Sequence, residues 1–256
     1  MAGDLAGKRA LVTGAGRGIG RAIAQHLAEQ GVAVAVAART ASDVEDVVAS
    51  LQAESSPHAA IALDLATEEG PTQLVKALSK FGAPEIVVHN LGGTCDVNDP
   101  FAPIEEWRKV MRLNFDVAVE LNRSLVPAMR DAKWGRVVNI ASVAAVELNG
   151  PPSYAAAKAA LCAYTRCVGR LLGADGVIMS AVLPGVVETE GGYWEQQRSD
   201  DPARVQKYLD ERCPLGRFGT PEEVASFVGF LCSDNASFNP GGVFPLDGGQ
   251  LRGYAF

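Results

Sequence analysis

The fold of this 256-residue chain is decided by the stretch ALVTGAGRGIG, residues 10–20. A short apolar run passes directly into a glycine-rich turn, and a helical pattern follows at Arg21–Gln30. Glycines let the backbone approach a pyrophosphate, and the helix that follows offers free N–H groups and the positive end of its dipole. The spacing departs from a generic GxGxxG motif, since Ile19 stands where its third glycine would be. A strand, this turn and a helix together favour a dinucleotide-binding turn over a merely structural one.

Short apolar runs alternate with longer helical patterns along the rest of the chain. The runs that predict strands are Ala10–Val12, Val32–Ala37, Ala59–Leu63, Ile86–Val88, Val137–Ile140, Val177–Leu183 and Val243–Leu246. Several are continuously apolar, which is typical of strands covered by helices on both faces. The predicted helices are Arg21–Gln30, Ser42–Ala53, Glu68–Phe81, Ile104–Arg130, Ser153–Gly173 and Pro221–Cys232. The alternation predicts an α/β fold, a Rossmann-type doubly wound three-layer sandwich with a seven-stranded parallel sheet.

Length and composition favour one domain over residues 1–256. The formal net charge of −7 argues against a nucleic-acid partner. Five cysteines without CxxC spacing predict reduced thiols, with neither a disulfide framework nor a metal site. We see no signal peptide and no apolar stretch of about 18 residues, so we expect a cytoplasmic protein without a membrane span.

One irregular stretch runs from Val187 to about Arg217 and is predicted to be a lid over the substrate. It carries two aromatic residues, Tyr193 and Trp194, which either stack on a substrate or anchor the lid. Further residues predicted to line the site are Thr94, Asp96, Glu147 and Asn149.

The end of the second predicted strand indicates which dinucleotide would bind. A site for NAD usually has a carboxylate there, to bond the ribose 2′-hydroxyl. This chain has Ala38-Arg39-Thr40 instead. Arg39, with Thr40 and with Arg17 in the turn, could receive a 2′-phosphate, because the planar guanidinium donates two bonds at once. The sequence therefore favours NADP(H), with NAD(H) possible.

A second group of polar residues predicts proton-transfer chemistry. Tyr154 and Lys158 are four residues apart, so they share one helix face. An ammonium group beside a phenol is expected to lower the phenol's pKa, as suits a general acid or base. Ser142 follows an apolar run, at a strand end where doubly wound folds place ligands. Asn114 is an unfavourable residue for a helix interior, and either a functional role or a local kink would explain it.

Together these motifs resemble the short-chain dehydrogenase/reductase family, in its branch of about 250 residues. The resemblance covers nearly the whole chain. It rests on the turn at 13–20, Asp64-Leu65, His89-Asn90-Leu91-Gly92, Asn114, Ser142, Tyr154, Lys158, the segment 184–189, Pro214-Leu215-Gly216-Arg217 and Asp247-Gly248-Gly249. The cofactor contacts it implies are Gly14, Arg17, Gly18, Ile19, Gly20, Arg39, Thr40, Asp64, Leu65, Asn90, Gly92, Tyr154, Lys158, Pro184, Val187 and Thr189.

The resemblance implies a role for each catalytic residue. Tyr154 would donate the proton to a carbonyl oxygen, Lys158 would lower its pKa and bond the nicotinamide ribose, and Ser142 would polarise the substrate. Asn114 would support a water between Lys158 and solvent. The family usually has NNAG where this chain has His89-Asn90-Leu91-Gly92, and a packed histidine is the favoured interpretation of that change.

The predicted activity is hydride transfer between NADP(H) and a small carbonyl compound or secondary alcohol. A 3-oxoacyl-[acyl-carrier-protein] reductase is the alternative, which would want a basic patch for its acidic carrier. Arg123, Arg130, Lys133 and Arg166 are available for one. A non-catalytic cofactor sensor is disfavoured, because the serine, tyrosine and lysine are all present. The resemblance also implies a homotetramer or homodimer, through the helices at 104–130 and 153–173 and the C-terminal tail at 251–256.

Overall fold

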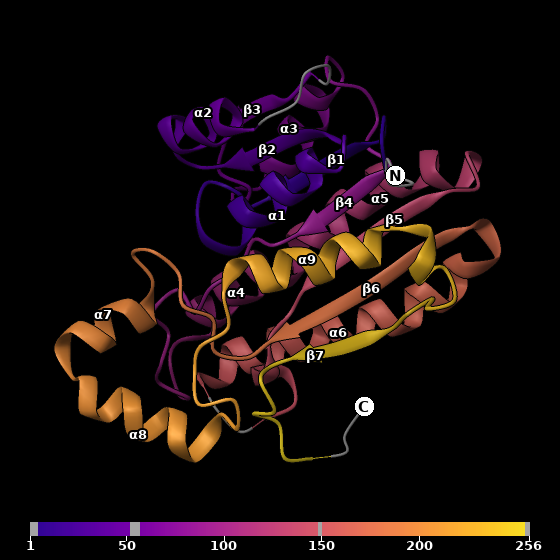
Figure 1. The fold of residues 1–256 in the computed structure, drawn as a ribbon. Helices are drawn as coiled ribbons and strands as arrows, with labels where there is room; N and C mark the ends of the chain where they lie inside the picture. The colour runs from indigo at the N-terminus through magenta and orange to yellow at the C-terminus, as the bar shows by residue number, and fades with distance from the viewer. Residues whose placement is uncertain (1–4, 52–56, 148–149, 254–256) are drawn as a thin grey trace.

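Seven parallel strands form one sheet in the order β3-β2-β1-β4-β5-β6-β7 in the computed structural model (Figure 1). The structure describes residues 5–51, 57–147 and 150–253. The strands are β1 Arg9–Thr13, β2 Ala33–Ala38, β3 Ala59–Ala62, β4 Ile86–His89, β5 Gly135–Ile140, β6 Val177–Pro184 and β7 Val243–Leu246. Every adjacent pair is parallel, from β2 beside β3 to β6 beside β7. The predicted seven-stranded parallel sheet is confirmed.

Helices cover both faces of the sheet. The helices are α1 Gly18–Glu29, α2 Ala41–Ser50, α3 Gly70–Leu78, α4 Ile104–Met111, α5 Val117–Asp131, α6 Pro152–Leu172, α7 Tyr193–Asp200, α8 Pro202–Arg212 and α9 Pro221–Cys232. The apolar residues of α1, α2 and α9 pack on one face, and those of α3, α5 and α6 on the other. This is the predicted doubly wound, three-layer arrangement.

The central strands are buried on both sides, as their continuous apolar runs predict. Every residue of β5 is buried. Its side chains alternate between layers: Val138 and Ile140 join the cluster of α1 and α9, and Val137 joins that of α5. The two-residue period of a strand sends neighbouring side chains to opposite faces, so both faces need apolar residues.

Two predicted segments differ from the structure. The stretch 187–217, expected to be irregular, contains the helices α7 and α8, which lie beyond the carboxyl ends of the strands (Figure 1). Helix α8 has a clear start, because Asp201 accepts a hydrogen bond from the Arg204 N–H at 3.0 Å and Pro202 opens the first turn. The helix predicted over 104–130 is interrupted by a π-helical turn, Arg112–Asp116, between α4 and α5.

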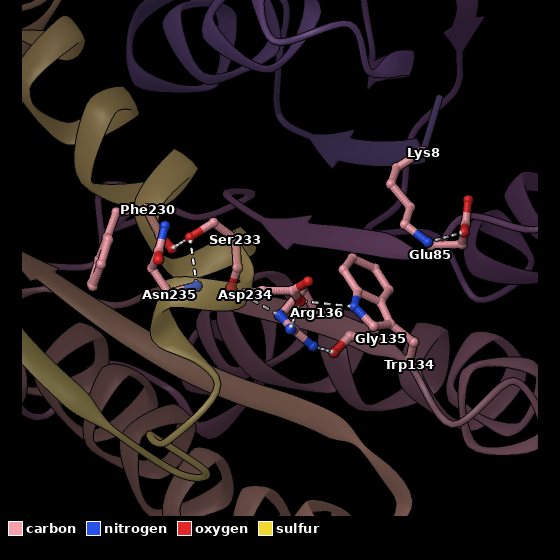
Figure 2. A network of polar contacts seen from close by, with 9 residues as sticks. All are labelled: Lys8, Glu85, Trp134, Gly135, Arg136, Phe230, Ser233, Asp234 and Asn235. Atoms are coloured by element: carbon pink, nitrogen blue, oxygen red, sulfur yellow. Dashed lines mark hydrogen bonds and ion pairs between the residues drawn. The ribbon is translucent and has the colours of Figure 1, made fainter. Parts of the chain in front are cut away.

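At the amino ends of β4 and β5 a network of ion pairs surrounds a buried arginine (Figure 2). Arg136 is 2% exposed, and its guanidinium lies 2.7 Å from Asp234 and donates to the Ser233 and Gly135 carbonyls. The Trp134 ring lies 4.4 Å from this guanidinium and 4.2 Å from the Lys8 ammonium. The pairing offsets the cost of burying a charge and joins the strand ends to the turn after α9.

Within the described residues, the structure contains no helix with the length and apolar character that a membrane crossing requires.

Candidate active site

The carboxyl ends of the strands carry the predicted site. Strand β1 lies between β2 and β4, so the chain order reverses beside it, and ligands of doubly wound folds bind at such a point. The turn after β1, the loop after β4, Ser142 after β5 and Pro184 at the end of β6 all lie along this edge.

Hydrogen bonds tie the glycine-rich turn to the loop after β4. The Thr13 hydroxyl accepts from the backbone N–H groups of Asn90 and Leu91, at 3.2 and 3.3 Å. The Asn90 amide donates to the Gly14 carbonyl at 2.9 Å. A side chain at Gly20 would stand 2.5 Å from that amide, so this position requires glycine.

Helix α1 begins at Gly18, which has a positive φ of +55°. The preceding residue, Arg17, provides no side-chain cap, so the first N–H groups of the helix remain available for an anion. A Cβ built on Gly18 would lie 3.2 Å from the Thr189 side chain. The structure thus brings Thr189, from the segment after β6, next to the amino end of α1.

Arg17 in the turn after β1, and Arg39 and Thr40 directly after β2, have exposed side chains. Within the described residues, neither arginine makes a hydrogen bond or ion pair through its guanidinium. Both groups could therefore bind a phosphate. Sequence reasoning missed Asp43, whose Cβ would lie 2.9 Å from a Cβ on Gly16. Asp43 lies in the first turn of α2, where acids are common for helix-dipole reasons, so its position in the sequence does not mark it as a site residue.

Asp64 and Leu65, both predicted to contact the cofactor, have different surroundings. Asp64 is exposed, and its carboxylate accepts from the Ala66 N–H at 2.9 Å. Leu65 is 2% exposed, and its side chain packs in the core with Leu74 and Leu78. Only the backbone of Leu65 is therefore placed to meet a cofactor.

Ser142, Tyr154 and Lys158 meet at the end of β5. Ser142 and Tyr154 line the same cavity, and the Ser142 hydroxyl acts to lower the pKa of Tyr154. The Lys158 ammonium donates to the Ile140 carbonyl at 2.8 Å and lies 5.7 Å from the centre of the Tyr154 ring. Burial lowers the pKa of Lys158 to about 8, and the nearby Cys162 thiol opposes this shift.

The tyrosine does not have the expected lowered pKa. Burial raises the pKa of Tyr154, and the hydrogen bond with Ser142 only partly opposes it. The sequence places a cation one helical turn away, but the fold directs that cation to the Ile140 carbonyl and desolvates the phenol. Tyr154 is therefore a protonated phenol at neutral pH in this state.

Asn114 lies in the π-helical turn and is 2% exposed. Its side chain accepts from the Gly93 N–H at 3.0 Å and donates to the carbonyls of Gly93 and Val110, both at 2.8 Å. A Cβ on Gly92 would lie 2.7 Å from the Asn114 oxygen and 2.8 Å from the Lys158 nitrogen. The fold thus brings Asn114 and Lys158 together around Gly92, and the π-turn gives the asparagine its position.

His89 is packed, as its favoured interpretation predicts. It is 3% exposed, and its ring lies 2.9 Å from the Asn122 side-chain oxygen. Burial lowers the pKa of His89 to about 4, against the smaller effect of that hydrogen bond.

A cavity of about 840 Å³ opens beside Ser142 and Tyr154. Thr94 and Asp96 line it, as predicted, and Asn149 lies outside the described residues. Glu147 lies behind the wall, where it binds Arg212 and Gln250. The cavity residues of α8 and Gln250 were not predicted from the sequence. Their positions depend on how the segment 187–217 packs against the carboxyl ends of the strands.

An aromatic cluster holds the segment 187–217 together. Trp194 packs on Tyr193, Tyr208 and Phe218, with ring centres 4.6 to 5.3 Å apart. Trp194 therefore anchors α7 to α8 and also lines the cavity, whereas Tyr193 is 63% exposed. Both of the roles left open for Trp194 are compatible with this position.

Comparisons with known proteins agree with this geometry. The family model described as enoyl-(acyl carrier protein) reductase matches residues 14–250. A 3-oxoacyl-[acyl-carrier-protein] reductase of Pseudomonas aeruginosa is 37% identical over 249 residues, covering 96% of this chain and 98% of that protein. The chain belongs to the short-chain dehydrogenase/reductase family. The predicted resemblance is confirmed, and this short-chain dehydrogenase/reductase is an oxidoreductase that acts on carbonyl or alcohol groups.

Solved structures of the family show the same fold. The L-sorbose reductase of Gluconobacter frateurii, in complex with NADPH and L-sorbose, has a TM-score of 0.90 and 32% identity, covering 99% of this chain and 100% of that chain. A 3-oxoacyl (acyl-carrier-protein) reductase of Agrobacterium tumefaciens with NADP bound has a TM-score of 0.86 and 30% identity, covering 96% and 95%.

Proposed function

We propose that this short-chain dehydrogenase/reductase reduces a small carbonyl compound in the 840 Å³ cavity, with Tyr154 as the proton donor. One observation carries the proposal: Ser142 and Tyr154 both line that cavity, and Lys158 is buried one helical turn from Tyr154. A protonated phenol is the form that can give a proton to a carbonyl oxygen, and burial keeps Tyr154 in that form.

The other residues orient this donor. Ser142 can bond the same carbonyl oxygen, because its hydroxyl is already beside that of Tyr154. Lys158 holds a proton at Nζ next to Gly92, where a ribose hydroxyl could meet it, and Asn114 fixes the Gly92-Gly93 backbone from the other side. These roles follow from contacts of this chain and are tested by substitution.

The cofactor is NADP(H), which supplies the hydride when bound. The L-sorbose reductase structure holds NADPH, and the Agrobacterium reductase structure holds NADP. The unpaired, exposed guanidinium of Arg39 at the end of β2, with Arg17 and Thr40, fits a 2′-phosphate. The glycine-rich turn and the open N-terminus of α1 fit the pyrophosphate, so the residues present suit the group. Further cofactor contacts proposed for this chain are Gly14, Gly18, Ile19, Gly20, Asp64, Leu65, Asn90, Gly92, Pro184, Val187 and Thr189.

A 3-oxoacyl-[acyl-carrier-protein] reductase is the second candidate, favoured by the Pseudomonas relative. The basic patch considered for carrier docking is weaker in three dimensions than in sequence, because Arg130 and Lys133 both pair with Asp175, at 2.6 and 2.8 Å. An assay of NADPH absorbance with ketones, ketoses and 3-oxoacyl thioesters separates the candidates. Turnover of none of them would reject the proposed function.

We further propose one domain with residues 187–217 as its substrate lid, working as a cytoplasmic homotetramer or homodimer. Helix α6 supports the assembly, because Ala156, Ala163 and Cys167 give it a small, exposed face on which a second copy could pack closely. Part of the tail considered for a second interface, residues 254–256, lies outside the described residues. Sedimentation of a stable monomer at micromolar concentration would contradict an oligomer.

A further inference from the structure

Gln250 lies at the wall of the cavity and carries an unused hydrogen-bond acceptor. The residue follows β7 and is 1% exposed. Its Oε1 is one of four buried side-chain polar atoms that lack a partner in the described part of the chain, and the other three belong to residues away from the cavity. A buried polar atom without a partner is unfavourable, so this atom needs an explanation.

The orientation of the Gln250 amide is fixed by its neighbours. Its Nε2 lies 2.8 Å from the Glu147 carboxylate and 3.4 Å from the Tyr208 hydroxyl. A carboxylate can only accept, so the nitrogen must face Glu147 and the oxygen must point elsewhere. Glu147 is itself held by Arg212 at 2.8 Å. The lid, through α8, and the loop after Ser142 therefore both hold Gln250 in one orientation.

The charges around the cavity cancel. Its charged lining residues are Asp96, Arg204, Lys207, Glu211 and Arg212. Arg212 pairs with Glu147, and Lys207 lies 3.9 Å from Glu211. One acid and one base, Asp96 and Arg204, are left over. With Glu147 included, three bases face three acids, so no net charge favours an anionic or a cationic substrate.

Neutral hydrogen-bonding groups also line the cavity. Thr94, Asn98, Gln197 and Tyr208 line the cavity together with Gln250. Amide and hydroxyl groups serve both donors and acceptors, as a ligand with several hydroxyls requires. An acyl chain would leave such groups unpaired, which lowers its affinity.

From these contacts we propose that the substrate is an uncharged polyhydroxy ketone, and that Gln250 is a specificity-determining residue whose Oε1 accepts a hydrogen bond from a substrate hydroxyl. The proposal rests on the proposed carbonyl reduction and names its substrate class. A site built to bond a hydroxyl rejects an analogue that lacks it, because the protein group is then left unpaired. Gln250 sets this preference without taking part in proton transfer.

The test compares carbonyl substrates on the whole enzyme with NADPH. L-Sorbose, D-fructose and their monodeoxy analogues are the polyhydroxy probes, and ethyl acetoacetate is the hydroxyl-free probe. We expect wild-type kcat/KM to fall ~10–100-fold for the deoxy analogue that lacks the bonded hydroxyl. This measurement requires no variant.

Gln250→Met removes the acceptor at nearly constant volume. We expect it to lower kcat/KM for the ketose by ~10–100-fold and to leave turnover of ethyl acetoacetate within about twofold. Gln206→Met is the matched control, because Gln206 lies on the lid helix α8, is exposed, and among the described residues bonds through its side chain to Asp210. The control should behave as wild type with both substrates.

The outcomes separate the two proposals. Equal losses for both substrates in Gln250→Met would make the residue merely structural and overturn this inference. Turnover of 3-oxoacyl thioesters or ethyl acetoacetate but of no ketose would also overturn it, while leaving carbonyl reduction intact. Absence of any carbonyl turnover would reject the proposed function itself.

Discussion

The two ends of the sheet treat polar groups in opposite ways. At the amino ends, the buried Arg136 has an ion pair, two carbonyl acceptors and a tryptophan ring. At the carboxyl ends, Lys158 is buried beside a single carbonyl acceptor with its pKa lowered to about 8, and Gln250 keeps an unused acceptor. Arg39 extends from the end of β2 without a partner among the described residues.

The difference predicts which end of the sheet contributes to the stability of the fold and which end contributes to catalysis. Groups that are fully paired contribute to the folded state and have nothing left to offer a ligand. Groups that are buried without full pairing destabilise the free protein, and bound molecules can complete them. Substitutions at the amino ends should therefore change the free energy of unfolding, and those at the carboxyl ends should change catalysis.

The largest expected effect is the loss of the proposed proton donor at the carboxyl ends. Tyr154→Phe removes only the hydroxyl, and we expect kcat to fall about 10³-fold or more, since general acid catalysis contributes on this scale. NADPH absorbance with an active carbonyl substrate measures the rate. NADPH fluorescence should show that the cofactor still binds.

Tyr164→Phe is the matched control on the same helix. Tyr164 accepts a hydrogen bond from Asn122 and is away from the cavity, so its loss should leave kcat within about twofold. A Tyr154→Phe enzyme with near wild-type kcat would remove Tyr154 from its proposed role and weaken the contrast between the ends.

His89 sharpens the comparison, because it is a packed group at the carboxyl end of β4. Its pKa is lowered from 6.5 to about 4, so the unfolded chain binds a proton that the folded chain does not. The stabilisation is complete above pH 6.5 and is lost as pH falls through 4. The shift corresponds to roughly 3 kcal/mol in the free energy of unfolding.

Urea unfolding at pH 7, 6, 5 and 4 measures this effect. His89→Asn should lose less stability than wild type between pH 6.5 and 4, because asparagine does not titrate. His26→Asn, at a half-buried position of α1, should follow wild type. Parallel curves for wild type and His89→Asn would show that His89 does not cause the acid sensitivity.

Substitution at the amino ends should affect stability alone. Arg136→Met leaves the Ser233 and Gly135 carbonyls without their donor and removes the contact with Trp134. We expect a loss of about 2 kcal/mol in the free energy of unfolding at pH 7, with kcat and KM unchanged. Asp234 is 61% exposed, so water can solvate it after the change.

Arg108→Met is the surface control, because its pair with Glu105 is largely exposed and should contribute under about 1 kcal/mol. A changed KM for NADPH in Arg136→Met would show that the amino and carboxyl ends of the sheet are coupled.

The smallest expected effect concerns the 2′-phosphate. Arg39→Ala removes one charge-assisted contact, so we expect KM for NADPH to rise about 10-fold while KM for NADH stays nearly constant. Initial rates at varied cofactor concentration measure both. Equal changes for the two cofactors would place Arg39 outside the 2′-phosphate site.

Much of the fold was predictable, because strands and helices in a doubly wound sheet have strong local patterns. The continuous apolar runs place β5 and β6 correctly to within two residues, and Thr220 caps α9 with Glu223 in the expected way. The main error was the expectation that the segment 187–217 would be irregular. Helix α7 buries no residue, and α8 buries only Val205 and Leu209, so neither has the long apolar period that identifies a helix in a sequence.

The sequence by itself determined the family, the fold class and the residue types proposed for proton transfer and phosphate binding. These depend on short motifs whose spacing is local, such as Tyr154 with Lys158. Only the tertiary structure decided the state of those groups: the raised pKa of Tyr154, the π-turn that brings Asn114 to Gly92, and the contact of Gln250 with Glu147. Burial and partners from distant segments set these properties, and neither is encoded in the spacing of residues along the chain.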